Sequence, residues 1–240
     1  MSPLSGSRAD ELVVFLATHA RGNVIDVGCG WGALLIRLLK ANRCLKGVGL
    51  DLDDQGFEHA IRVATAQGVA ERLRLIAGDA KHNLPTEVGG AICVGATQVW
   101  GPPVEAGMPL DYPAALAALR SMVPIGAPVV YGEGIWSTKP TEAAVAVLSG
   151  RLDEFVFLPD FVDLAWKAGF AVVSVHEANQ DEWDTFESGY TARYAEWLAV
   201  NEPSHPEYEC ILKKTCRQRD AYFRGYRGVL GMAYLCLLAV

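Results

Sequence analysis

The 240-residue sequence lacks the cysteine patterns that mark disulfide-rich and zinc-binding proteins. Its six cysteines form no CxxC pair and stand apart along the chain, at positions 29, 44, 93, 210, 216 and 236. Scattered cysteines predict neither a disulfide framework nor a zinc site. We therefore expect reduced thiols, a cytoplasmic protein and no metal ion.

Excess positive charge is also missing. The chain has 21 Lys and Arg against 28 Asp and Glu, a net charge of -7. Nucleic acids and anionic membranes attract basic surfaces, so we expect neither as a partner. The most basic stretch, 213–219, is flanked by Glu207, Glu209 and Asp220 and predicts a solvated helix face.

Long apolar runs are absent at both ends. The C-terminal run VLGMAYLCLLAV, residues 229–240, is far shorter than the roughly 20 residues that span a bilayer and predicts a buried strand. The first 20 residues carry polar side chains where a signal peptide needs a charged segment and an apolar core. We expect no membrane partner and no secretory leader.

What the sequence does contain is an alternation of short apolar runs with longer amphipathic ones. Such alternation predicts βαβ units, whose right-handed crossovers give a parallel sheet covered on both faces. The expected strands are 23–27, 45–50, 72–77, 90–95, 127–132 and 170–177, with a last strand at 229–238. The expected helices include 32–42, 57–67, 112–122, one from about Thr141, and 159–168.

The pattern changes between residues 178 and 227. This stretch predicts two charged, aromatic-rich helices interrupted at NEPSHPEY, residues 201–208. No repeat or low-complexity linker separates it from the rest of the chain. We expect one domain over 1–240, with a helical insertion at about 178–227 before the last strand.

The stretch VIDVGCGWG, residues 24–32, predicts a strand that bends abruptly into a helix. The first N–H groups of such a helix point at the bend, and glycines let a ligand approach them closely. Asp51 ends the next strand, 21 residues after Gly30, where an acidic residue accepts both ribose hydroxyls in nucleotide-binding folds. The pair predicts a nucleotide-cofactor site, although Asp51 could instead cap the following helix.

Two departures separate this bend from a dinucleotide site. The third glycine, Gly32, comes one residue early, as GxGxG in place of GxGxxG. Asp26 also lies within the bend, where a carboxylate would repel a pyrophosphate but attract the ammonium group of an amino acid. Both favour S-adenosylmethionine over NAD.

The same stretch resembles motif I of the class I, Rossmann-like, S-adenosylmethionine-dependent methyltransferases. The segments AGDA (77–80), ICVGAT (92–97) and RSMVPIGAPVVYGEGIW (120–136) are similar to later parts of that family. The resemblance implies an open seven-stranded, mostly parallel sheet with an antiparallel last strand. It implies that Asp26 lies near the cofactor's amino group, Asp51 binds ribose, Leu52 packs on adenine and Asp79 binds the adenine amino group. The full implied cofactor set is Asp26, Gly28, Cys29, Gly30, Asp51, Leu52, Asp79, Ala80, Gly95 and Ala96.

Substrate residues are expected beyond the carboxyl ends of the strands, where open parallel sheets bind ligands. The candidates are Thr97 and Trp100 after the fourth strand, Trp136 after the fifth, and Trp183 and Phe186 in the insertion. The last two begin an aromatic stripe that continues through Tyr190, Tyr194 and Trp197 on one face of a helix. The stripe either packs the insertion onto the domain or forms a lid over the substrate; both hold if only its inner end reaches the pocket.

Methyl transfer from a sulfonium needs alignment, with a base only where the acceptor holds a proton. The candidate catalytic residues are Glu133 at the end of the fifth strand, His176 at the end of the sixth, and Tyr190. GEGIW (132–136) and DEWDTFESGYTARYAEWL (181–198) resemble small bacterial methyltransferases that act on small molecules. No DPPY-like run follows the fourth strand, which disfavours methylation of DNA bases.

The expected function is therefore methyl transfer from S-adenosylmethionine to a small molecule, with a homodimer also considered. Three alternatives stay open: cyclisation of the cofactor's aminobutyl chain or a rearrangement on the same scaffold, an NAD-dependent reductase, and a non-catalytic cofactor-binding protein.

Overall fold

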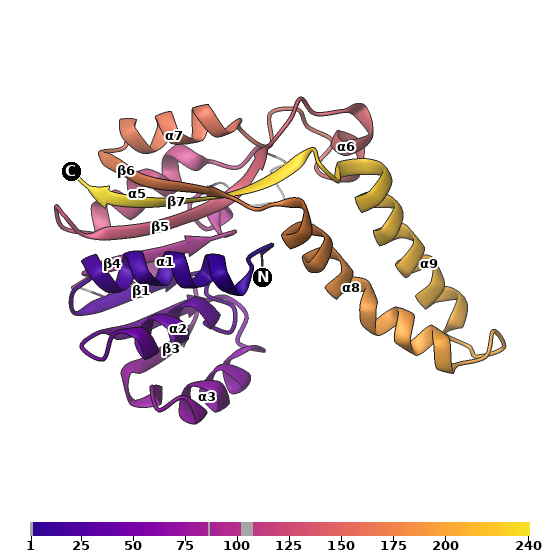
Figure 1. The fold of residues 1–240 in the computed structure, drawn as a ribbon, viewed down its shortest axis with the longest axis horizontal. Coiled ribbons are helices and arrows are strands. Elements are labelled where there is room, and N and C mark those ends of the chain that lie inside the picture. Colours follow the sequence, from indigo (N-terminus) through magenta and orange to yellow (C-terminus); the bar gives the residue numbers. More distant parts are fainter. Residues whose placement is uncertain (1, 86, 102–107) are drawn as a thin grey trace.

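A seven-stranded sheet in the order β3-β2-β1-β4-β5-β7-β6 forms the centre of the computed structural model, which describes residues 2–85, 87–101 and 108–240 (Figure 1). Strands β1 to β5 pair in parallel, and β7 is antiparallel to both β5 and β6. The strands are β1 (Asn23–Val27), β2 (Lys46–Asp51), β3 (Leu73–Ala77), β4 (Gly90–Val94), β5 (Pro128–Trp136), β6 (Phe170–Glu177) and β7 (Leu230–Ala239). The predicted α/β fold with an antiparallel last strand is confirmed.

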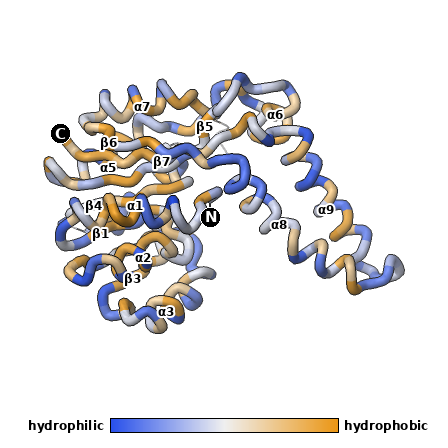
Figure 2. Tube along the Cα trace, viewed as in Figure 1, coloured by the Kyte–Doolittle hydropathy of each residue, from blue (hydrophilic) through white to orange (hydrophobic). Residues whose placement is uncertain are grey.

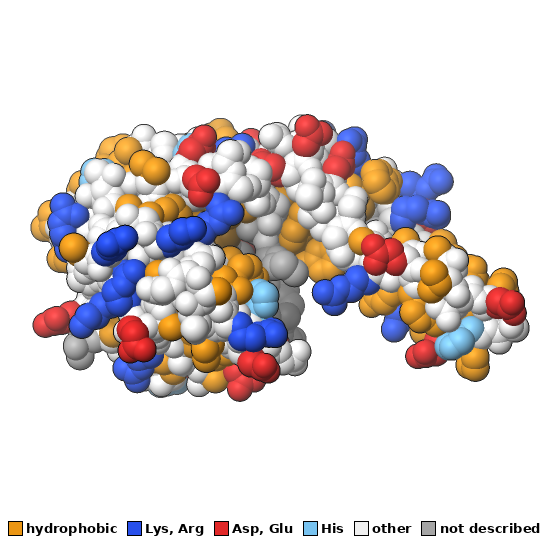
Figure 3. All heavy atoms as spheres, turned by 60° about the horizontal axis from the view of Figure 1, so that its bottom comes forward, with side chains coloured by type: hydrophobic (Ala, Val, Ile, Leu, Met, Phe, Trp, Pro, Cys, Tyr) orange, Lys and Arg blue, Asp and Glu red, His pale blue; other side chains and the backbone are white. Residues whose placement is uncertain are grey.

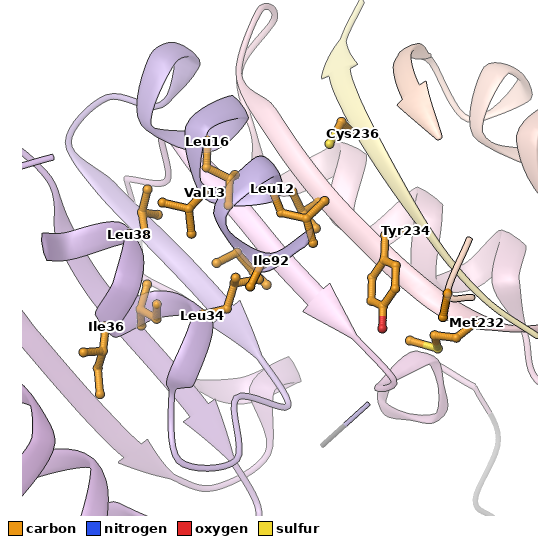
Figure 4. Packing of buried hydrophobic residues seen from close by; sticks show 14 of the residues in the cluster. Leu12, Val13, Leu16, Leu34, Ile36, Leu38, Ile92, Met232, Tyr234 and Cys236 are labelled. Carbon is orange, nitrogen blue, oxygen red and sulfur yellow. The ribbon is translucent and has the colours of Figure 1, made fainter. Parts of the chain in front are cut away.

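Helices cover both faces of the sheet because successive residues of each strand point to opposite sides. Val24 of β1 joins the apolar cluster under α1, α2 and α3, whereas Ile25 joins the cluster under α5 and α7. Figure 4 shows the first cluster, where Leu12 of α1 lies near Ile92 of β4. The helices named here are α1 (Gly6–His19), α2 (Ala33–Ala41), α3 (Phe57–Ala66), α5 (Tyr112–Met122) and α7 (Leu158–Lys167); α4 (Ala80–Asn83) and α6 (Glu142–Val147) are short.

One strand differs clearly from its predicted bounds. The sequence pattern ends the fifth strand at residue 132, but β5 continues to Trp136. The extension exists because β7 pairs with β5 along its whole length, from Pro128 opposite Leu238 to Trp136 opposite Leu230. The carboxyl end of β5, with Glu133 and Gly134, is therefore inside the sheet.

Two helices leave the sheet and run back along each other. Helices α8 (Gln180–Val200) and α9 (Tyr208–Asp220) contact one another and project from the rest of the molecule (Figure 1), and we call them the helical arm. A hollow separates the arm from the sheet and its helices in Figure 3. Figure 2 shows the arm as more hydrophilic than the strands. Although α8 has 21 residues, no helix in the described ranges is long and apolar enough to cross a membrane.

Candidate functional site

The bend after β1 is shaped by its glycines. Gly28 has a φ of +69°, and a Cβ there would lie 2.4 Å from the Cβ of Ala96, so the bend excludes any side chain at this position. The N–H of Gly28 donates to the carbonyl of Leu50 at 2.8 Å and holds the bend against β2. At Gly30, with a φ of +54°, no atom lies within 4 Å of the place that a Cβ would occupy. The bend is thus tightly packed on one side and open to a ligand on the other.

Asp51 joins this bend to the end of β2. Its Oδ2 accepts a hydrogen bond from the N–H of Gly30 at 2.7 Å, and its Oδ1 accepts one from the N–H of Asp53 at 3.0 Å. The residue that caps α3 is Gly56, so Asp51 does not serve as the cap of that helix. Each carboxylate oxygen keeps a second lone pair and can accept a further hydrogen bond from a ligand.

The loop after β3 lies beside Asp51. The N–H of Gly78 donates to the backbone carbonyl of Asp51 at 2.8 Å, which brings the next residue, Asp79, to the same edge of the sheet. The Asp79 side chain caps the short helix α4. Leu52 is 76% exposed, whereas Ala80 is buried. The sequence-predicted ribose and adenine residues are therefore neighbours at one edge, with Leu52 free to pack against a ligand.

Asp26 is a buried carboxyl group in this region whose pKa is strongly shifted. It lies on the central strand β1, is only 5% exposed, and its carboxylate accepts no hydrogen bond from the described residues. Burial, with a smaller contribution from the charge of Asp51, raises the pKa of Asp26 from 3.8 to about 8. An unpaired buried carboxylate is unfavourable, so this position favours binding of a cation.

A cavity of about 370 Å³ opens above Asp26, and we call it the bend cavity. One wall is the glycine bend, with Gly28, Cys29 and Gly30. Burial raises the pKa of the Cys29 thiol, which therefore stays protonated and uncharged. Another wall comes from Ser2, Leu4, Ser5 and Gly6 near the N-terminus and from Phe186 of α8. The cavity thus joins three distant parts of the chain around one carboxylate.

A second cavity of about 430 Å³, which we call the polar cavity, adjoins the first. The two cavities share four lining residues, which are Ser2, Leu4, Ser5 and Phe186. The rest of the lining is hydroxyl, amide or carboxylate, and consists of Ser7, Asn179, Asp181, Glu182 and Thr185. Its walls can form hydrogen bonds with a polar ligand, and Leu4 and Phe186 add apolar surface.

Two of the expected substrate residues are buried away from both cavities. Thr97 has no exposed surface, and its Oγ1 lies 2.6 Å from the hydroxyl of Tyr131. Trp136 is 1% exposed, and its indole N–H donates to the carbonyl of Leu152 at 2.9 Å. The structure therefore differs from the expectation that they contact a substrate, because both side chains are directed into the core.

Glu133 is buried and bonded to backbone N–H groups. Its Oε1 accepts from Gly134 at 2.8 Å, and its Oε2 accepts from Thr97 at 3.1 Å. Burial raises the pKa of Glu133, and these hydrogen bonds offset part of the increase. The carboxylate lines neither of these two cavities, and its catalytic role stays a prediction. Trp100, also expected at the substrate, lines neither cavity, and its buried indole N–H has no partner in the described ranges.

His176, a second candidate catalytic residue, faces α1. Its Nδ1 lies 3.3 Å from the carboxylate of Glu11, and its Nε2 lies 3.1 Å from the hydroxyl of Ser174. Both ring nitrogens therefore have partners within the protein, and the ring lines neither cavity.

The aromatic stripe of α8 divides into an inner and an outer part. Trp183 is buried and makes an edge-on contact with Phe186, which lines both cavities. Further along α8, Tyr190 and Tyr194 are 48% and 40% exposed, and Trp197 contacts His205 at the end of the arm. The stripe does not pack the whole insertion onto the sheet, and of its described residues only Phe186, at the inner end, lines the bend cavity and the polar cavity.

Comparison with known proteins shows similarity to methyltransferases in both sequence and fold. A family model described as "Methyltransferase domain" matches residues 24–107. An S-adenosylmethionine-dependent methyltransferase from Geobacter sulfurreducens, in complex with S-adenosylhomocysteine, is similar over 100% of this chain and 93% of its own, with a TM-score of 0.84 and 25% identity. The chain therefore resembles the class I methyltransferases, in sequence over residues 24–107 and in fold over its whole length.

Two further relatives extend this methyltransferase match. The structure of a Thiobacillus denitrificans S-adenosylmethionine-dependent methyltransferase with S-adenosylhomocysteine has a TM-score of 0.82 and 28% identity, covering 100% of this chain and 93% of its own. The uncharacterized protein YjhP of Escherichia coli is 28% identical over 181 residues, which are 74% of this chain and 69% of YjhP.

Sequence reasoning missed the N-terminal wall of the two cavities. Ser2, Leu4 and Ser5 line both of them but belong to no motif. They reach the site because α1 packs on the sheet with its N-terminus next to the start of α8. No local sequence signal reports that contact.

Proposed function

We propose that this protein transfers the methyl group of S-adenosylmethionine to a small polar acceptor. The observation that carries the proposal is the buried carboxylate of Asp26, which lines the bend cavity with no hydrogen-bonding partner in the described ranges. The α-ammonium group of S-adenosylmethionine supplies a matching positive charge. The two bacterial relatives hold S-adenosylhomocysteine, the product that remains when the methyl group leaves.

The residues around the cavity suit this cofactor. The bend cavity, at about 370 Å³, is within the size range of small-molecule sites. Gly30 leaves open space where a side chain would stand, so the backbone can approach the methionine part of the cofactor, beside Gly28 and Cys29. We propose that the α-ammonium group of the cofactor pairs with the carboxylate of Asp26.

We propose that the adenosine half of the cofactor binds at the adjoining strand ends. Asp51 keeps free lone pairs that would accept the ribose hydroxyls. Exposed Leu52 would pack on the adenine ring, and Asp79 would accept a hydrogen bond from its amino group. The remaining residues that we propose to contact the cofactor, through their backbone groups, are Ala80, Gly95 and Ala96.

The chemistry places few demands on the protein. When bound, the cofactor supplies an electrophilic methyl group, which an acceptor removes by in-line displacement. Catalysis then depends mainly on holding the acceptor in line and excluding water. Since Glu133 and His176 are engaged within the protein, we assign neither of them as a base.

We place the acceptor in the polar cavity. It adjoins the bend cavity through shared walls, and its volume of about 430 Å³ suits a small molecule. Most of its lining residues have hydroxyl, amide or carboxylate side chains. An acceptor that fits these walls carries hydroxyl or amino groups beside a small apolar part.

Calorimetric titration with S-adenosylmethionine, S-adenosylhomocysteine and NADH tests the cofactor assignment. We expect both adenosyl compounds to bind and NADH not to bind. Asp51→Ala should weaken S-adenosylhomocysteine binding at least tenfold, because the ribose loses a charged hydrogen-bond acceptor. Asp53→Ala is the matched control, since Asp53 also follows β2 but its carboxylate accepts, among the described residues, only from the neighbouring N–H of Gln55; it should change the Kd less than threefold.

Product analysis tests the reaction. Incubation with S-adenosylmethionine and a panel of small amines and hydroxyl compounds should release S-adenosylhomocysteine. Release of methylthioadenosine would indicate attack on the aminobutyl carbon and would replace methyl transfer as the function. Binding of NADH alone would refute the cofactor assignment.

A further inference from the structure

The N-terminal residues 2–5, which we call the strap, separate the two cavities. Ser2, Leu4 and Ser5 line both the bend cavity and the polar cavity. A segment with one side on each cavity forms a wall of both, so its position controls the shape of the bend cavity next to Asp26. The strap precedes α1 and has no regular secondary structure of its own.

Among the described residues, two hydrogen bonds join the strap to distant parts of the chain. The hydroxyl of Tyr234, a fully buried residue of β7, donates to the carbonyl of Pro3 at 3.0 Å. The N–H of Ser5 donates to Oε1 of Glu182 at 3.1 Å. The first bond attaches the strap to the sheet, whereas the second attaches it to the start of α8.

Glu182 is a rigid attachment point. Its side chain is 4% exposed, and both of its oxygens accept hydrogen bonds from Nε of Arg8, at 3.1 and 3.2 Å. Its Oε2 also accepts from the N–H of Asn179 at 2.9 Å, which completes a capping box at the start of α8. Charge-assisted hydrogen bonds of this kind are short and strong, so Glu182 fixes Ser5, Arg8 and the first turn of α8 as one unit.

We propose that Glu182 is a positioning residue for the cofactor: by holding Ser5 and Arg8, it keeps the strap across the bend cavity and couples the start of the helical arm to cofactor binding. This inference rests on the proposed function. Phe186 lies one turn after Glu182 and lines both cavities, so a shift of this turn moves two walls of the bend cavity together. Arg8 and Glu182 are 174 residues apart in sequence, and their contact is what joins the two walls.

The test compares two matched substitutions on α8. Glu182→Gln removes the charge that binds Arg8, whereas Glu187→Gln changes a second buried carboxylate of α8, which bonds Tyr226 and Gln218 and not the strap. We expect Glu182→Gln to raise the Kd for S-adenosylhomocysteine about tenfold in calorimetric titration. Glu187→Gln should leave this Kd within twofold. Hydrogen exchange should also be faster at residues 2–8 in the Glu182→Gln variant without any ligand.

A deletion tests whether the effect passes through the strap. Removing residues 2–4 should itself raise the Kd, and adding Glu182→Gln to the shortened chain should change the Kd less than twofold. If Glu182→Gln fails to fold, Tyr234→Phe releases the strap at Pro3 alone and should raise the Kd about threefold. An unchanged Kd in folded Glu182→Gln, or the same tenfold increase in the shortened chain, would overturn the proposal. Failure of the unaltered chain to bind S-adenosylhomocysteine would instead refute the proposed function on which it rests.

Discussion

The sheet, with the helices packed on it, and the helical arm are stabilised in different ways. Apolar side chains fill both faces of the sheet, and every residue of β5 is buried. In the arm, all residues of α9 are described and none is buried, while the buried residues of α8 are Glu182, Trp183 and Glu187. The sheet has an apolar core along its whole length, whereas the arm has buried side chains only near its base, where Trp183 packs beside polar contacts.

The pKa values of buried and partly buried carboxyl groups also differ between the sheet and the arm. Burial raises the pKa values of Asp26 and Glu133 in the sheet. At the base of the arm, hydrogen bonds from Arg227 and Tyr222 lower the pKa of Asp184 to about 2. Burial alone would raise the pKa of Glu182, but hydrogen bonds from Arg8, Ser5 and Asn179 outweigh it and lower the pKa to about 2. Carboxylates in the arm are used for structure, whereas Asp26 is left available to a ligand.

The largest expected effect comes from one substitution made in both regions. Leu237 of β7 is fully buried, whereas Leu212 of α9 is 40% exposed. Leu237→Ala should lower the free energy of unfolding by about 2–5 kcal/mol, because it opens a cavity in the core. Leu212→Ala should cost less than about 0.5 kcal/mol. Urea denaturation measures both, and equal losses would mean that the arm has an apolar core after all.

Much of the sheet could be predicted because its strands are buried on both faces. Near-continuous apolar runs located β1 at its observed bounds and β2, β3 and β4 within a residue of theirs. The end of β5 was missed because Gly132, Glu133 and Gly134 have the composition of a loop. Pairing with β7, which is about 100 residues away in sequence, keeps this stretch in the sheet.

An intermediate effect is expected from Asp26. Its pKa of about 8 in the folded chain exceeds its ordinary 3.8, so the ligand-free protein should lose stability as pH rises from about 4 to 8. Binding an ammonium group requires the ionised carboxylate. The affinity for S-adenosylhomocysteine should therefore rise with pH up to about 8, by as much as about tenfold, or 1.4 kcal/mol, per unit. Titrations at pH 6, 7 and 8 measure this slope.

Asp26→Asn separates this charge from the shape of the cavity. The variant should bind S-adenosylhomocysteine at least tenfold more weakly at pH 8, because no carboxylate remains to pair with the ammonium. It should also lose the pH slope. Asp53→Asn, at an exposed carboxylate after β2, should keep both the affinity and the slope. A slope that survives in Asp26→Asn would assign the titration to another group.

The candidate site could be predicted only in part. The bend, Asp51 and Asp79 were found because strand ends meet at one edge of a parallel sheet, and the structure brings them together. The sequence did not indicate which side chains turn inward, so buried Thr97 and Trp136 were expected at the substrate. It also could not indicate that Ser5 meets Glu182, because only the packing of α1 and α8 creates that contact.

The smallest expected effect is at the base of the arm. Asp184 pairs with Arg227 at 2.8 Å, but both side chains are partly exposed, so Asp184→Asn should cost less than about 1 kcal/mol. Because the folded pKa of Asp184 lies below its ordinary value of 3.8, the stability from this pair is present above about pH 4 and is lost as pH falls toward 2. Thermal melts followed by circular dichroism at pH 5 should show the unaltered chain to be more stable than Asp184→Asn, and at pH 2 most of this difference should be lost. A difference that is as large at pH 2 as at pH 5 would show that the Asp184 side chain stabilises the arm by means other than its charge.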